Sequence, residues 1–152
     1  MANTIKGEVG ILSLWDATIT TPAYLPIACA TSHTLDTSTS IIESNTKCDP
    51  GVTIKQAGVF SYTISLDGQY LDTTSAGAPD LDTLGSHDYL LALQQTGAVV
   101  EFELDTGLAD TTYYGDAIIS DLSLTQGSGD EISTFSLTLN GSGAIVTTDP
   151  NP

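Results

Sequence analysis

The chain has 152 residues, enough for one domain with a buried core, and its 40% hydrophobic residues and abundant Ser, Thr and Gly favour strands and turns over helices. Three lysines, no arginine and nineteen acidic residues give a formal net charge of −16. Such a chain has too few cations to neutralise nucleic-acid phosphates or to bind an anionic membrane surface, which excludes the usual nucleic-acid-binding and peripheral membrane proteins.

A short first strand is predicted over residues 7–15, and a longer one over residues 25–35. In the longer stretch one alternating set holds Leu25, Ile27, Cys29, Thr31, His33 and Leu35. This two-residue period is typical of an extended strand with one buried face. Strands usually run about 5–6 residues. A strand of roughly twice that length is too long for its own sheet, which indicates a role beyond its own domain.

The alternation then ends, and residues 36–53 are predicted to form a projecting loop or arm. This stretch is polar, has Ile41 and Ile42 exposed in its middle, and closes with the turn Asp49-Pro50-Gly51. It is much longer than the median connection of about 4–6 residues. We therefore expect either a mobile loop or an arm that reaches away from the domain.

The middle of the chain predicts a half-buried strand followed by a helix. The strand places Phe60, Tyr62, Ile64 and Leu66 on one face, and Asp67-Gly68 after it is a typical hairpin turn. A helix is predicted over residues 86–96, because Ser86 can cap its start and Gly97 suits its end.

The strand that follows the helix carries a row of acids. Its core face holds Ala98, Val100, Phe102 and Leu104, and its other face includes Glu101, Glu103 and Asp105. A pair of catalytic carboxylates is one interpretation of such a row. The solvated face of a sheet is the more common one, and we expect these three acids to face solvent.

Two further strands complete the predicted fold. The first places Ile118, Leu122 and Leu124 inward, and the second does the same with Phe135, Leu137 and Leu139. Turns are predicted at residues 127–130 and at Asn140-Gly141. The sequence thus predicts a mainly β protein: one domain over residues 1–152, an antiparallel β-sandwich or small barrel with one flanking α-helix.

No motif for catalysis or metal binding is complete. The Gly-Ser-Gly triplets at residues 127–129 and 141–143 resemble a nucleophile elbow, but neither forms G-x-S-x-G. Residues 80–91 begin like a calcium loop, yet Leu84 and Leu91 stand where ligand oxygens are required. We expect no enzymatic activity, no metal and no cofactor.

The two cysteines do not indicate a disulfide framework. Cys29 and His33 are four residues apart, which is about 13 Å along a strand and too far to share a metal without other ligands. Cys29 lies in the apolar set of its strand, which favours a buried free thiol over a bond with Cys48.

Two segments carry a resemblance to a known family. Residues 26–47, PIACATSHTLDTSTSIIESNTK, resemble the N-terminal region of siphophage tail tube proteins (the major tail protein), in which a strand leads into Ser/Thr alternation and a polar loop ends in a lysine, here Lys47. Residues 115–145, GDAIISDLSLTQGSGDEISTFSLTLNGSGAI, resemble the ending of the same family. The helix followed directly by a strand also fits.

The resemblance implies a structural virion protein that forms hexameric rings, stacked into the tube through which phage DNA leaves. Its implied partners are copies of itself and the tape measure, tail terminator and distal tail proteins, while DNA passes without specific binding. The implied location is the virion tail. Because the N-terminus lacks the features of a signal peptide, we expect synthesis and assembly in the host cytoplasm.

The resemblance also gives roles to three sets of residues. The long strand with Leu25, Ile27, Cys29, Thr31, His33 and Leu35 is the candidate for joining neighbouring subunits. The candidate inter-ring arm has Thr37, Ile41, Ile42, Glu43, Lys47 and Asp49. The candidate lumen-facing acids are Glu101, Glu103 and Asp105, since an acidic wall repels DNA and prevents it from sticking.

Two other functions remain open. A tube protein of a related injection apparatus has the same fold and ring but carries effectors. A β-sandwich adhesin or glycan-binding module uses exposed aromatic residues, for which the candidates are Trp15, Tyr70, Tyr113 and Tyr114.

Overall fold

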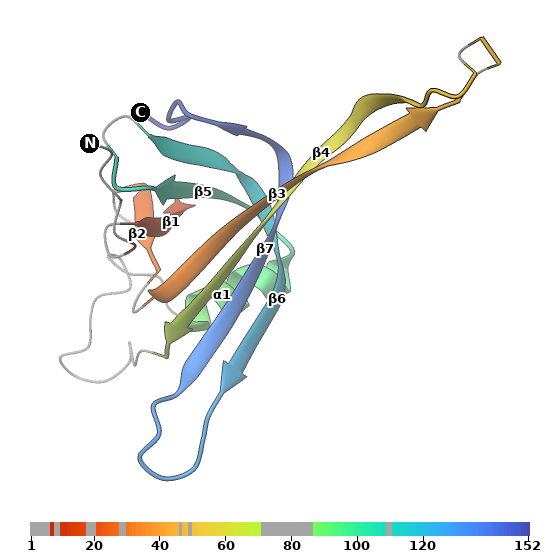
Figure 1. Cartoon of the computed structure of the whole chain (residues 1–152). Coiled ribbons are helices and arrows are strands. Elements are labelled where there is room, and N and C mark those ends of the chain that lie inside the picture. Colours follow the sequence, from red (N-terminus) through yellow and green to blue (C-terminus); the bar gives the residue numbers. More distant parts are fainter. Residues whose placement is uncertain are drawn as a thin grey trace, which may run out of the picture.

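The computed structural model describes residues 7, 10–17, 21–27, 30–45, 47–48, 50–70, 87–108 and 111–152. Its elements are β1 (Ile11–Asp16), β2 (Ala23–Pro26), β3 (Ala30–Ser44), β4 (Ile54–Gln69), α1 (His87–Thr96), β5 (Val99–Asp105), β6 (Thr112–Thr125) and β7 (Thr134–Val146) (Figure 1). All the strands form one antiparallel seven-stranded sheet in the order β2-β1-β5-β6-β7-β4-β3. The prediction of a mainly β, antiparallel fold with one helix is confirmed.

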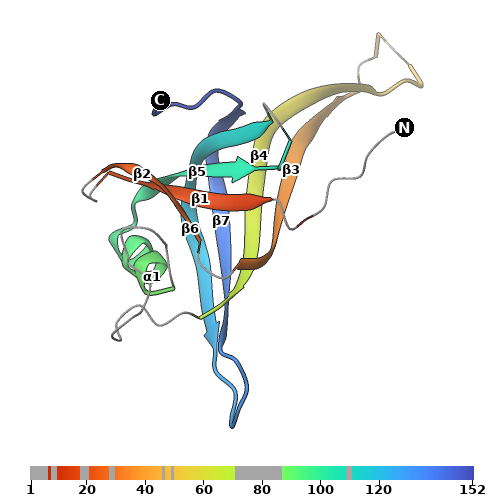
Figure 2. The ribbon, with the colours of Figure 1, turned by 90° about the vertical axis from the view of Figure 1, so that its left-hand side faces the viewer.

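The sheet curls around one apolar core (Figures 1 and 2). The rings of Tyr62 on β4 and Phe102 on β5 meet across it, with their centroids 5.8 Å apart. Gly10, just before β1, lies against the imidazole of His33 on β3. The ends of β1 and β3, which are far apart in the strand order, therefore approach each other. The core consists of Leu12, Leu14, Ile27, Tyr62, Ile64, Leu66, Leu90, Val100, Phe102, Leu104, Ala117, Ile119, Phe135, Leu137 and Leu139.

The expected single strand over residues 25–35 is wrong. Its first part belongs to β2, which pairs with β1, and its second part belongs to β3, which pairs with β4 at the other end of the strand order. Pro26 has no N–H to donate, which suits an edge strand such as β2. Ile27 then donates its N–H to the carbonyl of Leu12. The period continues across the break because both sides of it face the same core: Ile27 belongs to the core and Leu35 packs against it.

Two turns predicted from glycine dipeptides are strands instead. Asp67 and Gly68 lie inside β4, and Gly141 lies inside β7. At Gly141 the reason is packing, because the Tyr62 ring covers this glycine and an added Cβ would come within 2.2 Å of it. The Tyr62 hydroxyl donates a hydrogen bond of 2.5 Å to the backbone carbonyl of Asp116. The absence of a side chain at Gly141 therefore leaves the space that the Tyr62 ring occupies in the core.

A bulge in β6 reverses the predicted orientation of two residues. Ile118 is 43% exposed, whereas Ile119 is in the core. The register with β7 shifts between Ile119 and Asp121, so residues before and after the shift follow different alternations. Leu122, beyond the shift, packs against the core as predicted.

Helix α1 lies beside β6 (Figure 1). Leu90 is fully buried, and Tyr89 and Leu93 pack against the core, as their spacing predicts. Gln94 Nε2 donates to the backbone carbonyl of Ser120 at 3.3 Å. The predicted cap, Ser86, lies outside the described residues.

Candidate functional site

The most prominent surface feature is a projecting ribbon, here called the arm, that comprises residues 37–61. The last pair between β4 and β7 is Thr63 with Asn140, and beyond it β3 and β4 continue alone (Figures 1 and 2). Of the two alternatives predicted for residues 36–53, a loop or a projecting arm, the structure has an arm, which is paired strand as far as Ser44. Ser, Thr and Ile tolerate an extended chain well, and β4 supplies the hydrogen-bonding partner.

A bulge within the arm fixes which side chains share a face. The register of β3 and β4 shifts between Thr39 and Ile41. Val59 donates its N–H to Ser40 Oγ at 2.8 Å, and a Cβ at Gly58 would come within 2.3 Å of the same oxygen. Only glycine fits at this position without a shift of Ser40.

Ile41 and Ile42 point to opposite faces of the arm, because they are consecutive residues of a strand. They are 63% and 56% exposed. The face of Ile41 also carries the Glu43–Lys55 ion pair at 3.2 Å and, past the bulge, Phe60. The face of Ile42 also carries Ile54, which is paired with Ser44. Each face thus has its own apolar side chains.

The other predicted arm residues have simpler positions. Thr37 pairs with Tyr62 at the base of the arm. Lys47 and Cys48 are exposed near its tip, and Cys48 is a free thiol. Asp49 lies outside the described residues.

The arm differs from the rest of the chain in charge. Glu43 and Asp49 are balanced by Lys47 and Lys55, so the whole net charge of −16 lies outside the arm. The arm is therefore a segment that can approach another copy of this acidic chain without net repulsion.

The sheet leaves two long stretches of strand without a partner on one side. β3 is the last strand of the order, so its outer side is unpaired among the described strands. β6 pairs with β5 only over residues 112–118, and residues 121–125 pair with β7 alone. Unpaired edges of this kind are templates for pairing with another chain.

The outer face of the four long strands β6, β7, β4 and β3 is rich in hydroxyl groups. In the row Leu35, Ile64, Leu139 and Ile119, every side chain faces the core side. The row Ser32, Asp67, Ser136 and Ser123 faces the opposite way. The hydroxyl-rich face consists of Ser32, Thr34, Asp36, Thr63, Ser65, Asp67, Gln69, Asp121, Ser123, Thr125, Thr134, Ser136, Thr138 and Asn140, with the exposed Ile118 beside Asn140.

This hydroxyl-rich face carries aspartates and no cation. Ser136 Oγ donates to Asp67 Oδ1 at 2.6 Å, which holds one of these carboxylates against the sheet. Sequence analysis missed this face and the free edge of β6. The signal for the face was present in the polar residues that alternate with the predicted core residues, whereas an unpaired edge depends on distant strands.

Glu101, Glu103 and Asp105 are half-buried, so each is only partly exposed to solvent. The C-terminal residues contribute to this, since Asn151 Nδ2 donates to Glu101 Oε2. Burial raises the pKa of the Glu103 carboxyl above its ordinary value, and the carboxylates of Asp149 and Asp105 raise it further. The candidate lumen acids are thus partly desolvated within the subunit itself.

Tyr24 on β2 joins the C-terminal residues to the body. Its hydroxyl donates to Asp149 Oδ1 at 3.3 Å and accepts a hydrogen bond from Asn151 Nδ2. Burial and the nearby carboxylates of Asp149 and Glu101 raise the pKa of this phenol to about 12. The residues after β7 therefore lie against the β5 and β2 side of the molecule.

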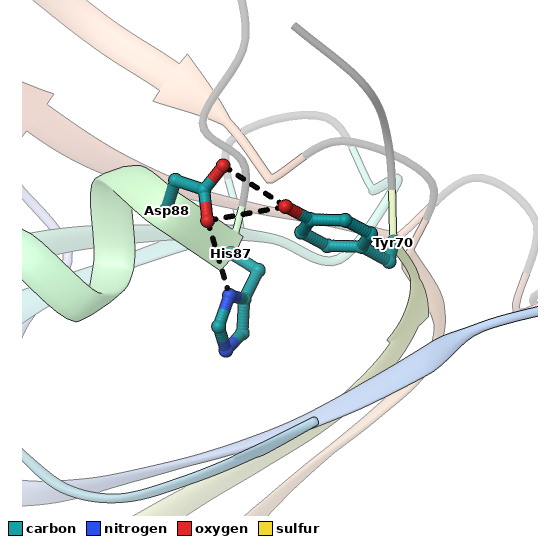
Figure 3. Close-up of polar contacts among 3 residues, drawn as sticks. All are labelled: Tyr70, His87 and Asp88. Atoms are coloured by element: carbon teal, nitrogen blue, oxygen red, sulfur yellow. Dashed lines mark hydrogen bonds and ion pairs between the residues drawn. The ribbon is translucent and has the colours of Figure 1, made fainter. Parts of the chain in front are cut away.

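The described side chains that most resemble an enzyme site form a polar cluster at the start of α1 (Figure 3). The Tyr70 hydroxyl donates to both carboxylate oxygens of Asp88, at 3.1 and 3.3 Å, and His87 Nδ1 lies 3.5 Å from Asp88 Oδ1. His87 is buried between the rings of Tyr70 and Phe135. A carboxylate in the first turn also suits the helix dipole. The cluster anchors the helix to the end of β4.

The candidate glycan-binding aromatics do not form an open platform. Trp15, Tyr70, Tyr113 and Tyr114 are all half-buried. Trp15 packs edge-on against Tyr24, with centroids 5.0 Å apart. Across the described parts of the chain, no group of three or more His, Cys, Asp or Glu residues is arranged to hold a metal ion. In the same parts, no helix is long and apolar enough to span a membrane.

Comparisons with known proteins agree with this geometry. Among solved structures, the tail of an empty gene transfer agent particle, refined with C6 symmetry, is 19% identical with a TM-score of 0.72, covering 96% of this chain and 100% of the other. The SPP1 tail tube is 12% identical with a TM-score of 0.68, covering 92% of this chain and 77% of the other. A chain of the anti-feeding prophage baseplate is 10% identical with a TM-score of 0.63, covering 96% and 97%.

At these identities the solved structures establish a shared fold. No curated protein sequence matches the chain. The family model described as "Phage tail tube protein" matches residues 4–147, which is nearly the whole sequence. The chain therefore belongs to the phage tail tube protein family and is a structural tube subunit, not an enzyme.

Proposed function

We propose that six copies of this chain close into a ring through their free strand edges, and that rings stack into a conduit for phage DNA. The observation that supports this most directly is the presence of two complementary edges, the outer side of β3 and residues 121–125 of β6. The number six is taken from the C6 symmetry of the gene transfer agent tail, which has the same fold.

The directions of the two edge strands favour this pairing. β6, β7, β4 and β3 are joined by three antiparallel pairings, so β3 runs opposite to β6. When β3 of one copy lies beside β6 of the next, the two are again antiparallel. The same contact then repeats around the ring, and each copy uses both the β3 edge and the β6 edge, as a heterologous closed ring requires.

The hydroxyl-rich face is our candidate for the wall of the conduit. It covers the four strands that would form the shared barrel, and it reaches both edges. Its hydroxyl groups and aspartates offer no cation to a DNA phosphate, so DNA can pass without being retained. β1, β2, β5 and α1, on the core side of these strands, would then form the outer layer.

The placement of Glu101, Glu103 and Asp105 on the lumen stays a prediction that competes with this one. These acids lie on β5, in the layer that faces the four long strands across the core, as the contact of Phe102 with Tyr62 demonstrates. Both outward faces point away from the same core. Only one of them can line the lumen of a given ring.

Two broader points complete the proposal. Contacts with tape measure, tail terminator and distal tail proteins belong to the ends and interior of a finished tail, which we propose as the location of the protein. The second candidate function is that of a tube subunit in an injection apparatus, because the anti-feeding prophage chain shares the fold.

Disulfide trapping tests the ring. Ser32 and Ser123 lie in one row at opposite edges of the four strands, so we would combine Ser32→Cys with Ser123→Cys. Both native thiols are removed by Cys29→Ala and Cys48→Ser. We expect a ladder of covalent oligomers that ends at the hexamer, while each single variant gives no ladder. Tubes that form normally without any cross-link would show that other edges close the ring. A map of the tube then identifies the face on its lumen.

A further inference from the structure

We propose that the arm is clamped between two copies of the chain in the neighbouring ring, with one copy against each of its faces. This inference rests on the proposed stacked tube and adds the partner of the arm and the number of copies that each arm contacts. It differs from a simple lateral contact, in which the arm lies on one surface and leaves its other face in water.

The distribution of apolar side chains on the arm carries the argument. Ile41 and Phe60 are on one face, and Ile42 and Ile54 are on the other. All four are exposed, at 63%, 43%, 56% and 41% respectively. A strand that is solvated on one side alternates apolar with polar residues, whereas apolar residues on both sides indicate burial of both faces. At the base of the arm Phe60 contacts the core ring of Tyr62, with centroids 6.0 Å apart. No contact of this kind is seen between the described body residues and Ile41, Ile42 or Ile54.

The isolation of the arm leads to the same conclusion. Beyond Thr63 it has two strands only, and a two-stranded ribbon is marginally stable in water. Its further large apolar residues, Val52 near the tip and Val59 at the bulge, are 61% and 77% exposed. Packing against both faces would bury these apolar side chains, as the core buries those of the rest of the sheet, and would stabilise the ribbon.

Charge explains why the covering partner is this same chain. Outside the arm the sequence has a net charge of −16, and a second copy is therefore a strongly acidic surface. The arm has no net charge and contains two of the three lysines, Lys47 and Lys55, both exposed. It can therefore approach the acidic body of another copy without net repulsion, whereas two bodies repel each other.

Adjacent isoleucines allow a sharp test of the two faces. We would make Ile41→Ser and Ile42→Ser separately, with Thr53→Ser as a control that changes an exposed polar residue of the same arm outside the paired strands. Each isoleucine variant should remain folded and form rings, but lose long tubes, and the control should form normal tubes. If only one of the two isoleucine variants loses tubes, the arm uses one face and the inference is overturned.

A dilution experiment counts the copies. Photo-reactive benzoylphenylalanine replaces both Ile41 and Ile42 in a tagged chain, which is assembled with a large excess of wild-type chain and irradiated. Clamping between two copies gives covalent trimers of one tagged and two wild-type chains. Dimers alone would show that a single copy covers the arm. If wild-type protein forms no tube at all, the proposed function fails together with the inference, and that result is distinguishable from the other two.

Discussion

The two halves of strand β4 have the same secondary structure but different surroundings. Residues 63–69 pair with β3 on one side and β7 on the other, and Ile64 and Leu66 are buried there. Residues 54–61 pair with β3 alone, and Ile54 and Phe60 are exposed. The first set is stabilised inside the subunit. The second set is less covered within the described subunit, where Phe60 contacts Tyr62 at the base of the arm, and we propose that it serves contacts between subunits.

This comparison separates folding from assembly along a single strand. A side chain in the body half should matter for the free energy of unfolding, and a side chain in the arm half should matter for tube formation. The experiments below use matched substitutions in the two regions, and each can break the separation.

The largest effect on stability is expected from Ile64→Ala. Ile64 is completely buried, and truncation of such a side chain typically costs about 2–5 kcal/mol because it leaves a cavity. The same change in the arm, Ile54→Ala, should leave the free energy of unfolding nearly unchanged and shorten or abolish tubes. Urea unfolding and electron microscopy of both variants check this. An unstable Ile54→Ala monomer would mean that the arm contributes to folding.

A smaller loss is expected from Gly141→Ala in the body. The added methyl group would meet the Tyr62 ring at 2.2 Å, and overpacking of this kind costs about 1–3 kcal/mol. Ser142→Ala, at the exposed neighbouring residue, should be close to neutral. The cost of Gly141→Ala should shrink when Tyr62→Leu is also present, because the ring that clashes is then absent. Thermal unfolding of the two alanine variants and the double variant measures these differences in stability. Equal melting temperatures for Gly141→Ala and the wild type would show that the ring moves aside freely.

Local alternation was sufficient to predict much of the core. It placed Tyr62, Ile64 and Leu66 inward, and the helical spacing around Leu90 was also correct. In both cases the side chains face a single core along one unbroken element. The period of the sequence is then the period of the structure, and no knowledge of distant partners is needed.

Features that depend on distant partners were not predictable in this way. The break between β2 and β3 leaves the alternation in phase, so residues 25–35 gave no sign that the chain crosses to another part of the sheet. Gly141 is a strand residue because Tyr62, far away in sequence, lies over it. Neither face of the arm is continuously apolar, so the sequence left a loop and a projecting arm as alternatives and gave no sign of its strand pairing. The free edge of β6 exists only because β5 is short.

The smallest expected effect concerns acids in the two regions, and its sign should differ between them. In the body, burial raises the pKa of Glu103, so between its ordinary value of 4.5 and the raised value the folded state binds more protons than the unfolded state. Stability from this group therefore falls as the pH rises through that window, and Glu103→Gln should raise the melting temperature at neutral pH.

In the arm, Glu43 is exposed beside Lys55, and exposed pairs contribute about 0–1 kcal/mol, so Glu43→Gln should be neutral or slightly destabilising. Melting temperatures of both variants at neutral pH and at a pH well below 4.5 provide the test. The gain from Glu103→Gln should disappear at the lower pH, where this carboxyl is protonated in the folded and the unfolded state alike. A gain that persists there would have to come from packing and not from charge, and it would end the distinction between a desolvated acid in the body and a solvated one in the arm.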